Sequence, residues 1–360
     1  MPKSAYIHIP FCLSKCKYCS FISFNQTELI NEYVNALIQE IKVNYAGERL
    51  NTLYFGGGTP SLVPADLLEQ VVQLFSFAAK AEITIEVNPD SVNKQYLSKL
   101  KNIDFNRISI GSQTFDDGIL KLIGRRHNSQ QIIEAVSSAK SAGFNNISVD
   151  LIYGLPTQTL EVLKQDLNKF ISLDIQHIST YGLKIEENSY FGKNIPKNLP
   201  DDDAQADMYL LINDTLEKAG FQRYEVSNFA KNEFESKHNL NYWNNEEYYG
   251  FGVSAHGYKN GIRYSKPCTI EKYIETPLLN ETEKCLTEQE KLEEEIFLGF
   301  RTTAGINVEH INKHYQIDFD KKYKNVLNKY CDYFEKTEQG YTLNLKGILL
   351  SNIILADFLD

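Results

Sequence analysis

Short β-rich segments alternate with amphipathic segments through the first half of the chain, and this alternation constrains the fold more than any other sequence feature. Apolar residues recur every three or four positions in the clearest predicted helices, residues 28–41, 64–77 and 129–143. Repeated strand–helix units place their strands parallel in one sheet. We therefore expect an α/β fold, a partial (β/α)6 TIM-like barrel whose ligand-binding loops follow the strands. The predicted strands span residues 5–9, 52–55, 82–87, 107–111, 147–154 and 177–183.

Beyond residue 185 the strand–helix alternation ends, and the sequence predicts two further parts of the chain. From Thr287 onward the composition is rich in Glu and Lys, and Thr287 to Glu290 form a capping-box pattern that opens a helix. The tail then shows helical segments and one short hairpin. We expect a barrel at residues 1–230, a connecting segment at 231–284 and a small, mainly helical, winged-helix-like domain at 285–360.

The charge and hydropathy patterns exclude several classes of partner. A formal net charge of −10 argues against non-specific nucleic-acid binding, which requires a basic face. The same acidic balance favours a packing or partner role for the winged-helix-like domain over DNA binding. No apolar run approaches the length that crosses a bilayer, and the N-terminal residues lack an apolar signal core. We therefore expect a cytoplasmic protein with no transmembrane segment and no nucleic-acid partner.

Cys12, Cys16 and Cys19 follow the first predicted strand with the spacing C-x3-C-x2-C. Structural zinc sites usually combine two C-x2-C pairs, and the other three cysteines of this chain are isolated. A [4Fe–4S] cluster bound by three thiolates keeps one iron open to an external ligand. His8 could complete a zinc site, but Tyr6 and His8 alternate with Ile7 and Ile9 along a strand, so His8 more simply points into the barrel interior. The spacing favours the cluster over zinc or inert thiols.

Glycines and a carboxylate follow the second and third predicted strands. Gly56, Gly57 and Gly58 allow close backbone approach to a ligand, although a glycine triplet is more often only a tight turn. Thr59 and the proline after it define that turn. Glu86 can accept two ribose hydroxyls, or it can be a solvated or salt-bridged strand end. The position of the glycine triplet beside the cysteine loop favours a ligand site there, whereas composition leaves the two roles of Glu86 open.

Gln113, Arg125 and Asp150 lie at the fourth and fifth predicted strands or just beyond them. Each can be a polar residue that lines the barrel and is satisfied by its neighbours. Because the polar motifs occur at consecutive strand ends, the sequence favours one shared site over separate structural roles.

His238, Tyr242 and Trp243 belong to an aromatic-rich segment, HNLNYWNNEEYYGFG, that holds the only tryptophan of the chain. Composition alone favours an aromatic-packed loop whose histidine forms local hydrogen bonds. The alternative is a site for a flat aromatic macrocycle, with an axial nitrogen from His238 and stacking surface from the rings.

Together these motifs resemble the radical S-adenosylmethionine (SAM) superfamily, and within it the coproporphyrinogen dehydrogenase-like branch with its HemW-type haem chaperones. The resemblance implies that the three clustered cysteines hold a [4Fe–4S] cluster whose open iron is chelated by SAM. Electron transfer from the reduced cluster would then cleave SAM to methionine and a 5′-deoxyadenosyl radical. The resemblance spans most of the chain and rests on YIHIPFC, CKYCSF, YFGGGTPS, EVNP, GSQTF, GRRH, DLIYGLP, YEVSNFA and HNLNYW.

The resemblance also implies roles for single residues, which we carry over by position. Tyr6 and Tyr18 would lie near the cluster and SAM. The methionine part of SAM would contact Gly57, Gly58 and Thr59, and the ribose would contact Glu86. Three further residues would complete the SAM region: Gln113, Arg125 and Asp150. The pattern HNxxYW is associated with haem binding in the chaperone group, which implicates His238, Tyr242 and Trp243.

Two departures separate this chain from the dehydrogenases of the branch. Those enzymes carry a further cysteine two residues after the third, whereas Ser20 and Phe21 follow Cys19 here. They also have an N-terminal extension, whereas the first predicted strand here starts at Ala5. We therefore expect a protein that binds haem, passes it to acceptor proteins and draws on an electron donor. Oxygen-independent coproporphyrinogen III dehydrogenation is the alternative.

Overall fold

The computed structural model describes residues 1–359, and one mostly parallel sheet organises most of them. Strands β1 to β6 pair in parallel, β9 adds in parallel beside β1, and β8 and β7 close the other edge antiparallel. The sheet is thus a partial barrel with open edges, as the alternation predicts. Its strands are β1 (Ser4–Ile9), β2 (Arg49–Gly57), β3 (Ser76–Val87), β4 (Arg107–Gln113), β5 (Ile147–Tyr153), β6 (His177–Gly182), β7 (Gln222–Arg223), β8 (Asn228–Ala230) and β9 (Tyr249–Phe251).

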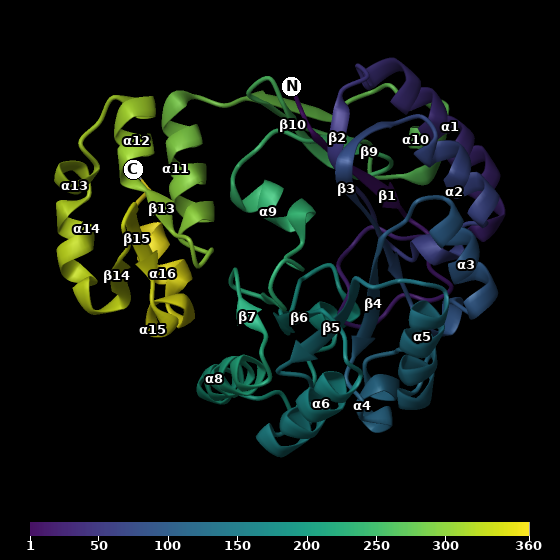
Figure 1. Cartoon of the computed structure of the whole chain (residues 1–360), viewed down its shortest axis with the longest axis horizontal. Helices are drawn as coiled ribbons and strands as arrows, with labels where there is room; N and C mark the ends of the chain where they lie inside the picture. Colours follow the sequence, from purple (N-terminus) through teal and green to yellow (C-terminus); the bar gives the residue numbers. More distant parts are fainter. Residues whose placement is uncertain (360) are drawn as a thin grey trace.

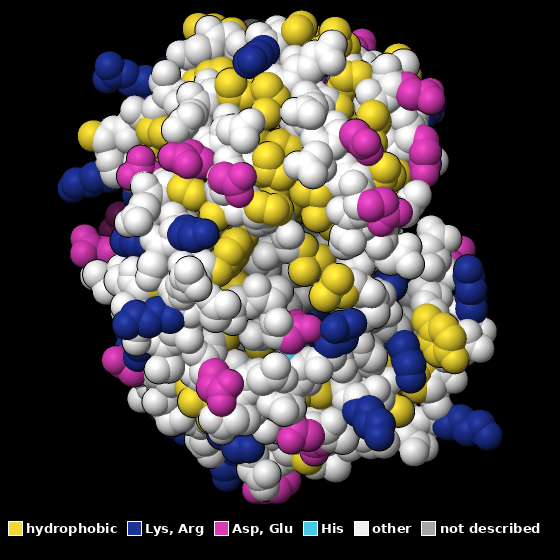
Figure 2. All heavy atoms as spheres, turned by 90° about the vertical axis from the view of Figure 1, so that its right-hand side faces the viewer, with side chains coloured by type: hydrophobic (Ala, Val, Ile, Leu, Met, Phe, Trp, Pro, Cys, Tyr) yellow, Lys and Arg dark blue, Asp and Glu magenta, His cyan; other side chains and the backbone are white. Residues whose placement is uncertain are grey.

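Helices cover the convex face of the sheet (Figure 1). They are α1 (Ile30–Asn44), α2 (Ala65–Val72), α3 (Lys94–Asn102), α4 (Asp117–Leu122), α5 (Ser129–Ser141), α6 (Leu160–Ser172) and α8 (Asp202–Lys218), with the short α7 (Tyr190–Lys193) in the loop after β6. Seen from the side of α1 to α3, acidic and basic side chains are interspersed over this helical face (Figure 2).

One predicted helix is shorter than its periodicity indicates. We expected a helix over residues 64–77, but α2 ends at Val72 and β3 already begins at Ser76. Ser76 and Phe77 pair with Arg49 and Leu50 of β2. Pairing in the sheet therefore overrides the helical pattern at the end of this segment.

Alternation along the strands separates an apolar layer from a polar one. Residues that face the helices are fully or almost fully buried, among them Ile7, Phe55, Ile85, Ile108 and Val149. The intervening residues point to the concave side of the sheet, as period-two geometry requires. They include Tyr6, His8, Tyr54, Glu86, Arg107, Ser109, Asp150 and Ser179. Helical packing thus stabilises the barrel while polar chemistry collects inside it.

Helix α9 (Lys237–Trp243) lies on the concave side of the sheet (Figure 1). Its N-terminus is anchored by Glu82 of β3, whose carboxylate accepts from the backbone nitrogens of Lys237 (3.2 Å) and His238 (3.1 Å). A carboxylate at this end satisfies unpaired amides and complements the helix dipole. The segment after α9 forms β9 and then a small antiparallel sheet with one helix, made of β10 (His256–Lys259), β11 (Ile262–Ser265), α10 (Ile270–Glu275) and β12 (Thr282–Cys285).

The C-terminal residues form a small helical domain with its own core. Its first helix starts with the predicted capping box between Thr287 and Glu290. The domain meets the barrel through a bridge between Glu225 and Thr302, and through Tyr209 of α8, which joins its core. No helix among residues 1–359 is long and apolar enough to cross a membrane. The elements are α11 (Glu288–Gly299), β13 (Ile306–Asn307), α12 (Val308–Tyr315), α13 (Phe319–Lys322), α14 (Lys324–Lys329), β14 (Phe334–Lys336), β15 (Gly340–Leu343), α15 (Leu345–Leu349) and α16 (Ser351–Ala356).

Candidate functional site

The loop after β1 brings its three cysteines to one cavity of about 390 Å³, which we call the cysteine cavity. The loop is closed by hydrogen bonds from Cys12 N to Phe24 O (2.9 Å) and from Phe24 N to Pro10 O. Most of the residues implicated by the sequence line this cavity together, although they come from five strands and their loops. They are Cys12, Cys16, Tyr18, Cys19, Gly57, Gly58, Thr59, Glu86, Gln113, Arg125 and Asp150.

The glycine turn after β2 holds the cysteine loop against the sheet. Gly58 N donates to Ile9 O (2.8 Å) and Thr59 N donates to Phe11 O (2.7 Å). The Thr59 hydroxyl lies 3.6 Å from Cys12 Sγ. These amides are already bonded within the chain, so the turn serves first to position Cys12 and to bring backbone close to the cavity.

We expect Gly58→Ala to destabilise the protein and to displace the cysteine loop. A Cβ at this position would lie 2.7 Å from Phe11 O and 2.9 Å from Ile9 O, and neither backbone carbonyl can move freely. Overpacking of this kind costs about 1–3 kcal/mol. Denaturant unfolding and the iron content of reconstituted protein measure the two effects.

Gly118→Ala is the matched control for that substitution. Its Cβ would meet only the Asp116 carboxylate at 3.1 Å, on the exposed helix α4. Alanine is also favoured over glycine within a helix. Equal stability and equal iron content in the two variants would contradict the role assigned to the turn.

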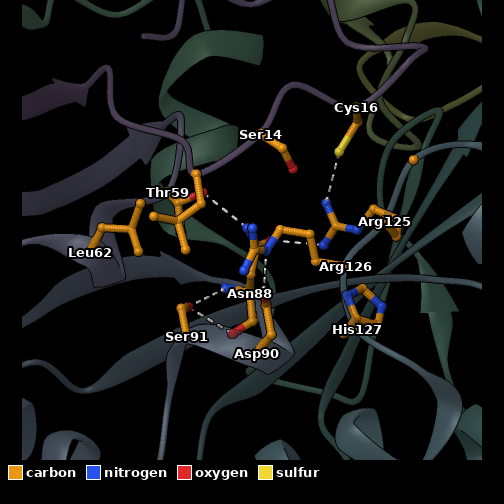
Figure 3. A pocket seen from close by; sticks show the side chains of 12 residues that line it. Ser14, Cys16, Thr59, Leu62, Asn88, Asp90, Ser91, Arg125, Arg126 and His127 are labelled. Carbon is orange, nitrogen blue, oxygen red and sulfur yellow. Dashed lines mark hydrogen bonds and ion pairs between the residues drawn. The ribbon is translucent and has the colours of Figure 1, made fainter. Parts of the chain in front are cut away.

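Arg125 links the cysteine loop to the loop after β3 (Figure 3). Its guanidinium donates to Cys16 Sγ (3.6 Å), to Asn88 Oδ1 (2.7 Å) and to Gly111 O. Asn88 in turn donates to the Thr59 hydroxyl at 2.9 Å. A buried cation beside Cys16 stabilises negative charge on sulfur, as thiolate ligands of an iron–sulfur cluster require.

Glu86 and Asp150 are buried carboxyls with internal donors. Tyr54 donates to Glu86 at 2.8 Å and Gly57 N donates to it at 3.1 Å, while Ser109 donates to Asp150 at 3.1 Å. Burial, followed by the charge of Asp150, raises the pKa of Glu86 to about 7. Burial also raises the pKa of Asp150. A carboxyl with a pKa near neutrality, such as Glu86, can accept or share a proton with a ligand hydroxyl.

Gln113 ends β4 in a left-handed conformation with φ of 71°. The register of β4 against β5 shifts between Gly111 and Gln113, so a bulge re-aims the side chain into the cysteine cavity. A non-glycine residue in this region carries strain that is common at ligand sites.

A second cavity of about 510 Å³ lies between α9 and the concave side of the sheet, and we call it the histidine cavity. Glu86, Asp150, Tyr181 and Phe21 line both cavities, so the two adjoin. Phe21, which stands where the related dehydrogenases carry a fourth cysteine, is 65% exposed at this junction.

His238 is the central side chain of the histidine cavity. Its Nδ1 lies 2.8 Å from the Thr52 hydroxyl, and its Nε2 lies 2.8 Å from the Tyr242 hydroxyl. The ring stacks on Tyr54 at 4.9 Å between centroids. Burial, followed by the positive charge of Arg107, lowers the pKa of His238 to about 3. The imidazole is therefore neutral at physiological pH, and neutral imidazole is the form that binds metals.

Tyr6 and Tyr242 line the histidine cavity with His238, whereas Trp243 lines neither cavity. Trp243 follows Tyr242 by one residue, about 100° further around the helix. His8 also faces the histidine cavity, with its ring nitrogens 3.1 Å from the Tyr6 hydroxyl and 3.0 Å from Ile22 O. It therefore points into the barrel as its alternation predicts, with both ring nitrogens engaged.

The cysteine set suits a cluster better than a single metal ion. Within residues 1–359, no three Cys, His, Asp or Glu side chains are arranged to hold one ion. A cubane cluster spaces its thiolates more widely, because each binds a different iron. Three thiols that line one cavity and an adjacent Arg125 fit such a cluster.

Arg107 is a member of the histidine cavity that motif analysis did not identify. Its side chain is 2% exposed and lines the cavity with Ser109, two residues further along β4. A signal was present in the sequence, because RISIG alternates polar with isoleucine residues and so places an arginine on its inward-facing side.

A three-cysteine loop after β1, a glycine turn after β2 and inward polar residues on a partial barrel define a radical SAM protein. The family model for the radical SAM superfamily matches residues 6–170, and the model for the HemN C-terminal domain matches residues 286–350. The sequence is 39% identical to the heme chaperone HemW of Lactococcus lactis, covering 99% of this chain and 97% of that protein. The chain belongs to the HemW family.

One further relative agrees with this family assignment, and one solved structure agrees with the fold. The heme chaperone HemW of Bacillus subtilis is 38% identical, over 99% of both chains. Coproporphyrinogen III oxidase (HemN) from Escherichia coli, a solved structure, has a TM-score of 0.88 over 99% of this chain and 90% of that one. At 24% identity, the HemN structure supports the fold alone.

Proposed function

We propose that the protein binds haem in the histidine cavity and transfers it to acceptor proteins, with a [4Fe–4S] cluster and SAM in the adjoining cysteine cavity. The observation that carries the proposal is a neutral, buried His238 that stacks on Tyr54 inside a cavity sharing a wall with the three cysteines. The relatives named heme chaperones support the same function.

In this proposal Cys12, Cys16 and Cys19 hold the cluster, and Arg125 stabilises its negative charge. When bound, the cluster supplies one-electron chemistry and an open iron for SAM. Glu86 binds the ribose hydroxyls of SAM. Gln113 and Asp150 border the same ligand.

His238 would bind the haem iron through a ring nitrogen. Thr52 orients the ring through Nδ1, as a partner on the other nitrogen does in metal-binding histidines. The Tyr242 hydroxyl shares the opposite nitrogen and must turn aside when iron binds. Tyr6 and Tyr54 offer aromatic surface beside the macrocycle.

His238→Ala is expected to weaken haem binding by about tenfold or more, because one coordinate bond and its orientation are lost. Titration of reconstituted protein with haem, followed by absorbance and electron paramagnetic resonance, measures the affinity and the axial ligand. His256→Ala is the matched control, since His256 lines the same cavity without hydroxyl partners on its ring. Unchanged affinity and spectra in His238→Ala, or a loss confined to His256→Ala, would refute the assignment.

Coproporphyrinogen III dehydrogenation is the competing function, and the same reconstituted sample tests it. We expect no conversion of coproporphyrinogen III to protoporphyrinogen IX with SAM and a reductant, because Phe21 replaces the fourth cysteine of the dehydrogenases. Detection of that conversion would favour the dehydrogenase function over haem transfer. None of the cysteines in the described residues forms a disulfide, which fits a reducing cytoplasm.

A further inference from the structure

Arg107 is a buried cation that has no partner of its own in the histidine cavity. The side chain is 2% exposed, and its Nε is buried without a hydrogen-bond partner. Burial lowers the pKa of Arg107, but the charges of nearby groups, Glu82 and Asp150 among them, outweigh burial and raise it overall. None of the described residues accepts a hydrogen bond from Nε. An arginine stays charged at any physiological pH, and a buried N–H group without an acceptor is unfavourable. A ligand of opposite charge would satisfy it.

The carboxylates whose charges act on Arg107 already accept hydrogen bonds from other donors. Glu82 accepts from the backbone nitrogens at the start of α9, at 3.2 and 3.1 Å. Glu86 accepts from Tyr54 and from Gly57 N. Asp150 accepts from Ser109 at 3.1 Å. These groups compensate the charge of Arg107 through space but leave its buried Nε without a hydrogen-bond acceptor.

Arg107 also differs in charge from the other side chains that line the histidine cavity. It is the only lysine or arginine among the described residues that line the histidine cavity, and it is absent from the lining of the cysteine cavity. The remaining lining is aromatic, hydroxylic or acidic, apart from Ile22 and Asn239. A negatively charged ligand group that enters this cavity therefore has one cationic partner.

We propose that Arg107 binds a carboxylate of the ligand that occupies the histidine cavity, and that this carboxylate is a propionate of haem. The inference rests on the proposed function and extends it. A guanidinium matches a carboxylate with two parallel hydrogen bonds, which determines orientation as well as affinity. With iron at His238 and a propionate at Arg107, the propionate edge of the macrocycle would be directed toward β4.

The test compares haem with haem dimethyl ester, whose carboxylates are blocked, on the reconstituted full chain in one detergent. We expect wild-type protein to bind haem about 10- to 100-fold more tightly than the ester. Arg107→Gln should lose that preference, binding haem more weakly and the ester unchanged. Arg107→Lys keeps the charge without the planar fork and should retain part of the preference. Arg301→Gln, which removes a cation from the C-terminal domain, should behave as wild type.

Each outcome separates this inference from the proposed function. Haem bound equally tightly by wild type and Arg107→Gln would overturn the carboxylate site while leaving haem binding intact. Equal wild-type affinity for haem and the ester would overturn it as well, even if Arg107→Gln does not fold. A wild-type protein that binds neither compound would instead refute the proposed function.

Discussion

Reconstituted Cys16→Ala protein is expected to retain little cluster, whereas wild type should hold about four irons and four sulfides per chain. Cys16 is one of only three thiols on the wall of the cysteine cavity, and Arg125 donates to its sulfur. A cubane with two protein ligands has two open irons and dissociates readily. Iron and sulfide analysis, with the visible charge-transfer absorbance, measures the loss.

Cys331→Ala provides the control for that experiment. Cys331 is an exposed thiol in the C-terminal domain, outside both cavities, so its loss should leave the iron content unchanged. Full retention of iron and sulfide by Cys16→Ala would contradict the assignment of the cluster. Stoichiometric zinc without sulfide in wild type would end the radical SAM interpretation of the cavity.

Lys266→Ala is expected to cost about 3–5 kcal/mol of stability, the largest effect we predict for a side chain outside the site. Lys266 and Glu40 form an ion pair of 2.8 Å whose side chains are 2% and 0% exposed. Glu40 also accepts from Gly252 N (3.0 Å) and from Tyr273, so it joins α1 to the segment after β9. Removal of the lysine leaves a buried carboxylate uncompensated.

The cost of Lys266→Ala should depend on pH. Burial raises the pKa of Glu40, and Lys266 opposes that rise. Without Lys266, Glu40 in the folded protein keeps its proton at pH values at which Glu40 in the unfolded chain has already lost it. Stability of the variant relative to wild type therefore falls as pH increases from about 5 to 8.

Two comparisons test the ion-pair explanation by denaturant unfolding. Lys272→Ala removes an exposed partner of Glu281 and should change stability by less than about 1 kcal/mol. The double variant Glu40→Leu with Lys266→Met should recover much of the loss, because both charges leave together. A double variant as unstable as Lys266→Ala would show that side-chain packing, and not the unpaired charge, determines the loss of stability at this position.

The local elements of the barrel could be predicted because each follows from short-range physics. The six predicted strands correspond to β1 to β6, and the helix predicted to stop near Gly143 ends at Ser141. Gly143 adopts φ of 90°, the left-handed conformation that ends a helix. The segment at 64–77 was predicted less well, since the pairing of Ser76 with Arg49 spans 27 positions and has no local signal.

The chain alone determined which side chains face the barrel interior, because period-two alternation assigns Tyr6, His8 and Glu86 to one face wherever the strands pair. The sequence also determined that three cysteines share one loop and that a glycine turn positions this loop. Only the tertiary structure decided that His238 would meet Thr52, 186 positions away, and that the buried Nε of Arg107 would be left without a hydrogen-bond acceptor. An unsatisfied buried donor is a property of all the neighbours at once, so no stretch of sequence could reveal it.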